Sequence, residues 1–203
     1  MTDGITWLKD YDGPLTALLF AKGITPEELA ARMGGEPLPE PATELEVDDL
    51  LPEPYREDGY GDAAIRVGTS GSWTLAVEYG DSPAGGLLPE LSQGGVELVR
   101  YCPAQDHPPT LFDHARDGVH LCGYGLTEEL WRWGTRPDLL VPELVAAGIL
   151  AADGETYLPA DGDGNGEQQR SLAFLERRFG LALSPAYLQD ARLPVYALRD
   201  LSG

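Results

Sequence analysis

Asp113, His120 and Cys122 supply a carboxylate, an imidazole and a thiol within ten residues of one another, and enzymes use these groups for acid–base and nucleophilic chemistry. They belong to a stretch, residues 111–124, that predicts a β-hairpin with a two-residue Asp-Gly turn at 117–118. This turn places Asp113 opposite Cys122. One face of the hairpin then carries Asp113, His120, Cys122 and Tyr124, and the other carries Phe112, His114, Val119 and Leu121.

Metal-ligand residue types occur in two places, but their spacing fits neither zinc nor calcium. The set Cys102, His107, His114, His120 and Cys122 contains no CxxC or HxxxH spacing, and the hairpin sends His114 and His120 to opposite faces. Residues 161–167 resemble the start of an EF-hand loop, with Asp161, Asp163 and Asn165 at ligand positions. Leu172 occupies the twelfth position, where the loop requires a bidentate Glu. We therefore expect no metal and no other cofactor.

Trp131-Arg132-Trp133 places two tryptophans around one cation. Exposed tryptophans beside an arginine make a good interface anchor, and this interpretation makes Trp131 and Trp133 candidate partner-binding residues. The alternative is that the two rings cover the edge of the core.

The charge of the chain restricts its partners. The 203 residues carry a formal net charge of -20, from 14 Lys and Arg against 34 Asp and Glu. Because phosphate contacts require Lys and Arg clusters, direct binding to nucleic acid or to an anionic membrane is disfavoured, and a basic protein is the natural partner. The apolar runs are too short for a membrane span. Two cysteines are few for a secreted disulfide scaffold, which favours reduced thiols in the cytoplasm.

Residues 36–62 form a segment rich in proline and acids, with Arg56 as its one basic residue. The composition favours a solvated connector over a dedicated binding segment. If acidic steering matters, the densest candidate partner-binding carboxylates are Glu44, Glu46, Asp48 and Asp49.

The order of the expected elements favours one α+β domain over residues 1–203. Thr25, Pro26 and Glu28 predict the start of a short helix that ends at Gly34. Residues 65–79 predict a second hairpin, with Trp73, Leu75 and Val77 on one buried face. Helices are expected over 138–147, 167–179 and from Ser184, so the final third reads as helical. The fold class is therefore a mostly antiparallel sheet of hairpins with flanking helices.

Several stretches together resemble an uncharacterised actinobacterial family, a domain of unknown function. They include Phe20-Ala-Lys-Gly-Ile-Thr-Pro-Glu-Glu-Leu29, Gly71-Ser-Trp-Thr-Leu-Ala-Val-Glu78, Glu90-Leu-Ser92 and Leu175-Glu-Arg-Arg-Phe-Gly180. The resemblance implies a single intracellular α+β domain from a high-GC bacterium. It carries no activity and no functional residue over to this chain.

The leading hypothesis is a non-enzymatic, acidic, intracellular binding protein, for example an immunity-type protein that neutralises a basic toxin. The acidity is equally consistent with a device for solubility. One alternative is a nucleic-acid-mimic regulator that occupies a basic groove. Another is a small enzyme that uses Asp113, His120 and Cys122.

Overall fold

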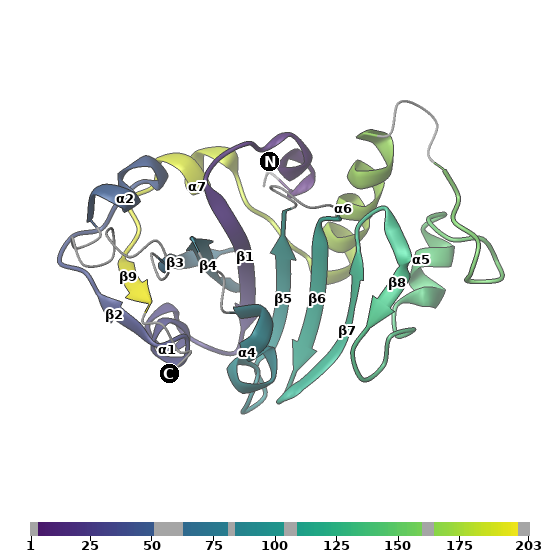
Figure 1. Ribbon diagram of the computed structural model, residues 1–203, viewed down its shortest axis with the longest axis horizontal. Helices are drawn as coiled ribbons and strands as arrows, with labels where there is room; N and C mark the ends of the chain where they lie inside the picture. Colours follow the sequence, from purple (N-terminus) through teal and green to yellow (C-terminus); the bar gives the residue numbers. More distant parts are fainter. Residues whose placement is uncertain (1–3, 51–62, 81–83, 104–108, 160–164, 199–203) are drawn as a thin grey trace.

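A computed structural model describes residues 4–50, 63–80, 84–103, 109–159 and 165–198 of the chain (Figure 1). The described strands form one nine-stranded sheet in the order β2-β9-β3-β4-β1-β5-β6-β7-β8, and each adjacent pair is antiparallel. The strands are β1 (Leu15–Lys22), β2 (Gly35–Pro37), β3 (Ala63–Ser70), β4 (Trp73–Tyr79), β5 (Glu97–Cys102), β6 (Leu111–Arg116), β7 (Val119–Gly125), β8 (Glu128–Trp133) and β9 (Val195–Leu198).

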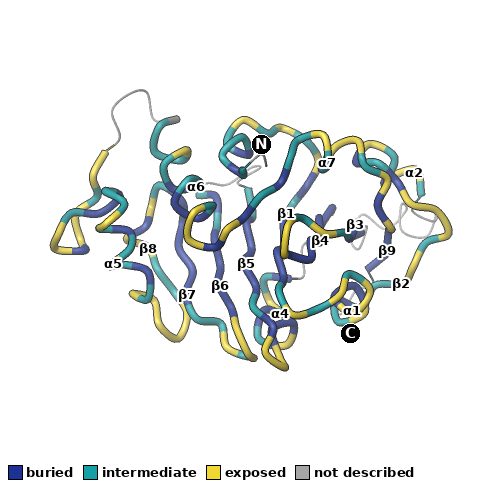
Figure 2. Tube along the Cα trace, turned by 180° about the vertical axis from the view of Figure 1, so that it is seen from behind, coloured by how far each residue is buried: buried dark blue, intermediate teal, exposed yellow. Residues whose placement is uncertain are grey.

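Helices cover both faces of this sheet. On one face, apolar side chains of the sheet pack against α1 (Pro26–Arg32) and α4 (Ala84–Leu91). On the other face they pack against η1 (Thr6–Asp10), α2 (Val47–Leu50), α5 (Val141–Ala146), α6 (Asn165–Phe179) and α7 (Pro185–Asp190). A further 3-10 turn, η2, spans Glu44–Glu46. The protein is therefore an α+β fold with an apolar core on each side of the sheet. Figure 2 shows that the strands in the middle of the sheet are largely buried, whereas the loops at its edges are more exposed.

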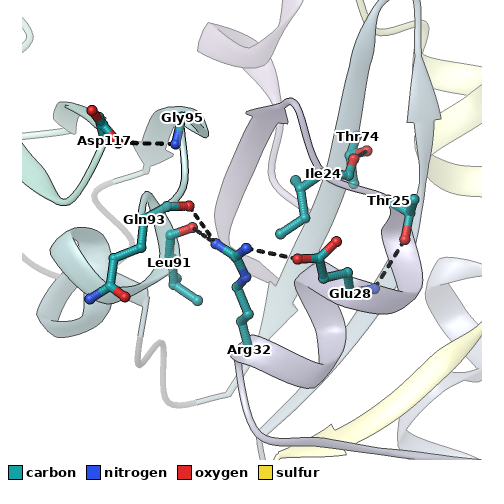
Figure 3. A network of polar contacts seen from close by, with 9 residues as sticks. All are labelled: Ile24, Thr25, Glu28, Arg32, Thr74, Leu91, Gln93, Gly95 and Asp117. Carbon is teal, nitrogen blue, oxygen red and sulfur yellow. Dashed lines mark hydrogen bonds and ion pairs between the residues drawn. The ribbon is translucent and has the colours of Figure 1, made fainter.

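The α1 helix begins where the sequence predicts. The Thr25 hydroxyl accepts a hydrogen bond from the backbone N–H of Glu28 at 3.2 Å, and Pro26 occupies the first turn. The Glu28 carboxylate does not close a capping box. It pairs instead with Arg32 at 2.7 Å, and Arg32 also donates to the carbonyls of Leu91 and Gln93 (Figure 3). Arg32 thus ties the end of α1 to the end of α4.

Both expected hairpins form, as β3–β4 and β6–β7. Trp73, Leu75 and Val77 share one buried face as expected, but the opposite face of β4 is buried too, because helices cover both sides of the sheet. Two elements form where the sequence carries little periodic signal: α4, which contains Pro89, and β8, which contains Trp131 and Trp133. The final third contains the strand β9 as well as helices, so it is not helical throughout as expected.

The first part of the acidic segment is not a solvated connector. Pro37 in β2 pairs with Tyr196 in β9, and Ala42 pairs with Leu193 in an isolated bridge. These main-chain pairings fasten residues 35–42 to the C-terminal segment, which explains why an acidic, proline-rich sequence is ordered here. Residues 51–62, the remainder of the segment, lie outside the described residues.

No helix in the described part of the chain combines the length and the apolar character that a membrane crossing requires.

Candidate functional site

Asp113, in β6, is a buried carboxylate that side chains from three other strands contact. Its Oδ1 accepts a hydrogen bond from Trp133 Nε1 at 2.8 Å and lies 3.0 Å from His120 Nε2. Its Oδ2 accepts a hydrogen bond from Arg100 Nη1 at 3.0 Å. The contacts come from β8, β7 and β5, so one carboxylate joins four neighbouring strands on the face of the sheet that carries α4.

The contacts decide the charge of Asp113. Burial alone raises the pKa of this carboxyl, but hydrogen bonds from His120 and Trp133 and the charge of Arg100 outweigh burial and hold the pKa below its usual value. The carboxylate is therefore ionised at neutral pH, and its oxygens are already occupied by donors from the protein.

The register of the β6–β7 hairpin differs from the expected one by one residue. An irregularity next to His114 shifts the pairing, so Asp113 lies opposite Gly123 and His114 lies opposite Cys122. With a regular two-residue turn, Cys122 would lie opposite Asp113 and Leu121 would lie opposite His114. An extra residue in one strand moves every later side chain to the other face, and the Asp-Gly turn alone does not announce such a bulge.

The shifted register separates the expected catalytic grouping. Asp113 and His120 do share a face, but Cys122 belongs to the apolar core on the opposite face. Burial raises the pKa of the Cys122 thiol to about 12, so the sulfur stays protonated and is a poor nucleophile. The prediction that Asp113, His120 and Cys122 share one face is therefore wrong for Cys122.

Gly123 makes the contact between Trp133 and Asp113 sterically feasible. A Cβ atom at Gly123 would lie 2.3 Å from Trp133 Nε1 and 2.6 Å from Asp113 Oδ1. Both distances are far inside van der Waals contact, so any side chain here would separate the indole from the carboxylate. No local sequence pattern marks Gly123 for this role, because the two side chains that require it belong to neighbouring strands.

Two arginines that are not among the predicted site residues contact the buried acids. Arg66 lies between Ile65 and Val67, Arg100 lies between Val99 and Tyr101, and both arginines are buried. A buried cation requires a nearby anion. An arginine that interrupts an apolar strand is thus the signal that predicts a buried partner such as Asp113, although it does not say which acid that partner is.

The two tryptophans of β8 have different environments. Trp133 is half-buried and bonded to Asp113, whereas Trp131 keeps 54% of its surface exposed and Leu130 keeps 48%. The two indole rings contact each other, with centroids 5.0 Å apart. Trp133 therefore supports the inner side of the Trp131 ring, while the outer side of that ring faces solvent.

The exposed apolar residues of β8 have acidic neighbours. Glu128 is exposed at the start of the strand, and Asp138 pairs with Arg132 at 3.0 Å. Arg132 also donates to the Glu129 carbonyl, so the cation of this surface is already engaged. We call Leu130, Trp131 and the flanking acids Glu128 and Asp138 the β8 patch.

Glu44 is not a surface carboxylate, which corrects its assignment to a partner-binding set. It is 4% exposed, it accepts a hydrogen bond from the Tyr11 hydroxyl at 2.6 Å, and it lies 3.8 Å from Arg66. Arg66 also donates to Tyr79 and to the Leu188 carbonyl. Burial raises the pKa of Glu44 despite these contacts. This carboxyl fastens the η2 turn to the sheet.

The other three acids of this set remain at the surface. Glu46 closes a capping box with Thr43 and pairs with Arg192 at 2.7 Å, and Asp48 and Asp49 are exposed in α2. Leu45 beside them is 84% exposed. We call Leu45, Glu46, Asp48 and Asp49 the α2 corner.

The α2 corner and the β8 patch lie at opposite ends of the molecule (Figure 1). The corner adjoins β2 and β9 at one end of the sheet, and β8 is the strand at the other end. Eight strand spacings of about 4.8 Å separate the ends by roughly 38 Å along the sheet. The two sets of candidate partner-binding residues therefore do not form one contact surface.

Among the described residues, no three His, Cys, Asp or Glu side chains converge as metal ligands. His114 packs against Phe179 and pairs with Glu97, and His120 contacts Asp113 on the other face, as the hairpin prediction has it. His107 and the acids of the calcium-like loop, Asp161 and Asp163, lie outside the described residues.

A comparison with family models matches residues 7–199 to a model described as a family of unknown function (DUF6461). No curated protein matches the chain. No solved structure matches it either.

Proposed function

The chain belongs to the DUF6461 family, whose description assigns no activity, and we propose from its own surface that it is a non-enzymatic binding protein for a basic protein partner. In its specific form, the proposal is an immunity-type protein of the bacterial cytoplasm that neutralises a basic toxin. In this proposal, the basic partner binds at the β8 patch.

The observation that carries the proposal is the exposure of Trp131 on a fixed support. An exposed tryptophan gains much from desolvation by a partner, and a rigid one loses little conformational entropy on binding. Trp131 packs on Trp133, which Asp113 holds through its indole N–H. The buried carboxylate of Asp113 therefore fixes the position of Trp133, and Trp133 in turn supports the exposed ring of Trp131.

The electrostatics favour a basic partner. The arginines Arg32, Arg132, Arg178 and Arg192 each pair with a carboxylate, so they do not form a basic patch, and the net charge of -20 leaves acids in excess. A field of this sign raises the encounter rate of a cationic protein and suppresses anionic partners.

The cysteines are consistent with a reducing compartment. Cys102 and Cys122 are both free thiols. Cys122 lies in the core beneath α6, whereas Cys102 follows Arg100 on the face that carries α4, so the sheet separates the two sulfurs. This arrangement supports the cytoplasmic part of the proposal.

A site-specific crosslinking experiment tests the proposal. A photo-crosslinking residue replaces Leu130 in the β8 patch, Leu45 in the α2 corner, or Val119, which is 40% exposed at the start of β7. Each protein is irradiated in lysate of the organism that encodes the chain, and captured proteins are identified by mass spectrometry.

The proposal expects a basic protein that is crosslinked from position 130 and not from positions 45 or 119. Capture of the same protein from position 45 alone would move the contact to the α2 corner. Capture of acidic proteins, or equal capture from all three positions, would contradict a specific basic partner.

A further inference from the structure

A pocket lies where the ends of three strands meet η1 and α6. It has a volume of about 280 Å³, and its wall includes Lys9, Tyr101, Thr110, Thr127 and Gln168. Tyr101 is the residue before the last in β5, Thr110 precedes β6, Thr127 lies in the turn between β7 and β8, and Gln168 is near the start of α6. The volume is near the lower end of the range for small-molecule sites.

The charge of the pocket wall is opposite to that of the chain. Among the lining residues that the structure describes, Lys9 is charged and none is acidic. The chain has 34 acids and only two lysines, Lys9 and Lys22. The Lys9 ammonium contacts the carboxylate of Asp10 at 2.7 Å, and Asp10 is largely exposed. Since an exposed ion pair contributes little, an anion in the pocket can share this ammonium, which has three donor hydrogens.

Two polar contacts in the wall are long. Tyr101 is 3% exposed, yet its hydroxyl reaches the Leu8 carbonyl only at 3.5 Å. The Gln168 amide, which has two donor hydrogens, hydrogen-bonds the Tyr101 hydroxyl and reaches the Thr110 hydroxyl at the same long distance of 3.5 Å. Hydrogen bonds of this length are weak, so the Tyr101 O–H and one amide hydrogen of Gln168 can turn to a ligand oxygen.

The backbone at Thr127 is strained where it borders the pocket. Thr127 has φ of 69°, in a region that β-branched residues rarely adopt. Its N–H donates to the buried Glu129 carboxyl at 3.1 Å, and Leu126 N–H bonds the Thr110 carbonyl at 2.8 Å. Strain of this kind persists where the surrounding structure fixes it, and it gathers at ligand sites. A glycine would make the turn without strain but would leave no hydroxyl in the wall.

We propose that this pocket binds a small organic carboxylate. Lys9 supplies the positive charge, and the hydroxyls of Tyr101 and Thr127 and the amide of Gln168 supply hydrogen bonds. The apolar part of the wall consists of Leu8, Tyr11, Pro103, Pro109 and Leu126. The ligand therefore combines one carboxylate with a compact apolar body. The inference is independent of the partner proposed for the β8 patch.

Binding of aromatic and aliphatic monocarboxylates, each compared with its primary amide, tests the inference by protein-observed NMR. Benzoate, phenylacetate and hexanoate are the probes, titrated to about 10 mM, a range that detects weak affinities. The acids should shift the backbone signals of Leu126, Thr127 and Gln168. The amides, which lack the charge, should bind about tenfold more weakly.

The two lysines provide a matched pair of variants. Lys9→Met should weaken carboxylate binding about tenfold, since it removes the ammonium and keeps the stem. Lys22→Met should leave binding unchanged, because Lys22 lies over the Trp73 ring at the other end of β1. Thr127→Gly, which removes the hydroxyl and the strain, should weaken binding while keeping the fold.

Three results would overturn the inference. One is that no probe acid shifts the pocket signals at about 10 mM. Another is equal binding of acids and amides, or equal effects of the two lysine variants. The third is that the acids shift only Arg32, Gln93 and Gly94, which line a separate surface pocket and would indicate nonspecific attraction to an arginine.

Discussion

The indole N–H of Trp133 donates to the buried carboxylate of Asp113 at 2.8 Å, across the bare α-carbon of Gly123. The three residues lie on β8, β6 and β7, so the contact spans the strand between its partners. It connects the buried charges of the sheet to the exposed Trp131, because Trp131 packs on the Trp133 ring.

Gly123→Ala should destabilise the protein by about 1–3 kcal/mol, because the added methyl separates Trp133 from Asp113 and leaves a buried carboxylate with one donor fewer. Urea denaturation measures the change. Gly86→Ala is the matched control, since Gly86 lies in α4 with no atom near the new methyl and alanine favours a helix. If both variants unfold at the same urea concentration, the Trp133–Asp113 contact contributes nothing to stability.

Thr25→Ala should destabilise the protein by about 1 kcal/mol, through loss of the hydrogen bond that the Thr25 hydroxyl accepts from the Glu28 N–H. Chemical denaturation measures the shift in midpoint. Thr25→Ser keeps an oxygen at the same position and should restore most of the loss. An unchanged midpoint for the alanine variant would show that this cap does not stabilise α1.

These two predictions differ in how far the sequence anticipates them. The cap of α1 is local: Thr25, Pro26 and Gly34 act on their own backbone, so their order along the chain is sufficient. The bond from Trp133 to Asp113 depends on a bulge in a hairpin and on a strand, β8, whose residues do not alternate in polarity. Tertiary packing sets the register of the β6–β7 hairpin and the pairing of β8 at the edge of the sheet. Neither can be predicted from the local pattern of a single sequence.

The same distinction explains the acidic segment. The composition of residues 36–50 indicates solvation, because prolines and acids seldom pack into a core. In the structure, Glu44 is buried in contact with Arg66 and Tyr11. Main-chain pairing with the C-terminal segment fixes residues 35–42, which precede Glu44. The partners of Glu44 lie far away along the chain, so no local pattern distinguishes it from the exposed Asp48 and Asp49.

Glu129→Gln should flatten the pH dependence of stability above about pH 4.5. Glu129 is fully buried, with Oε1 accepting from Thr127 N–H and the Ser171 hydroxyl, and burial raises its pKa above the usual value. The folded protein therefore binds this proton more tightly than the unfolded chain does. The stabilisation is complete below the unfolded pKa and is lost as pH rises through the folded pKa.

Urea denaturation at several pH values between 4.5 and 8 measures this effect. Between these limits, the unfolding free energy of the parent should fall more steeply with rising pH than that of Glu129→Gln. Glu128→Gln is the control, because Glu128 is the exposed neighbour on the same strand and its removal should leave the slope intact. Parallel pH profiles for the parent and Glu129→Gln would show that Glu129 titrates alike in the folded and unfolded states.

The final prediction concerns which end of the sheet meets the partner. Trp131→Ala should speed dissociation of the captured basic protein about tenfold or more, because truncation of a central aromatic anchor acts mainly on the dissociation rate.

Neutralising the α2 corner with Glu46→Gln, Asp48→Asn and Asp49→Asn should leave both the association rate and the dissociation rate unchanged at about 0.15 M salt. The Debye length there is about 8 Å, far shorter than the roughly 38 Å between the two surfaces. Trp131, Asp48 and Asp49 are exposed, and Glu46→Gln keeps an oxygen for the capping box with Thr43, so folding should persist in each variant. Stopped-flow mixing at low and physiological salt separates the rates. If the corner variant instead slows association and flattens its salt dependence while Trp131→Ala does neither, the partner binds the α2 corner and the β8 patch is not its contact surface.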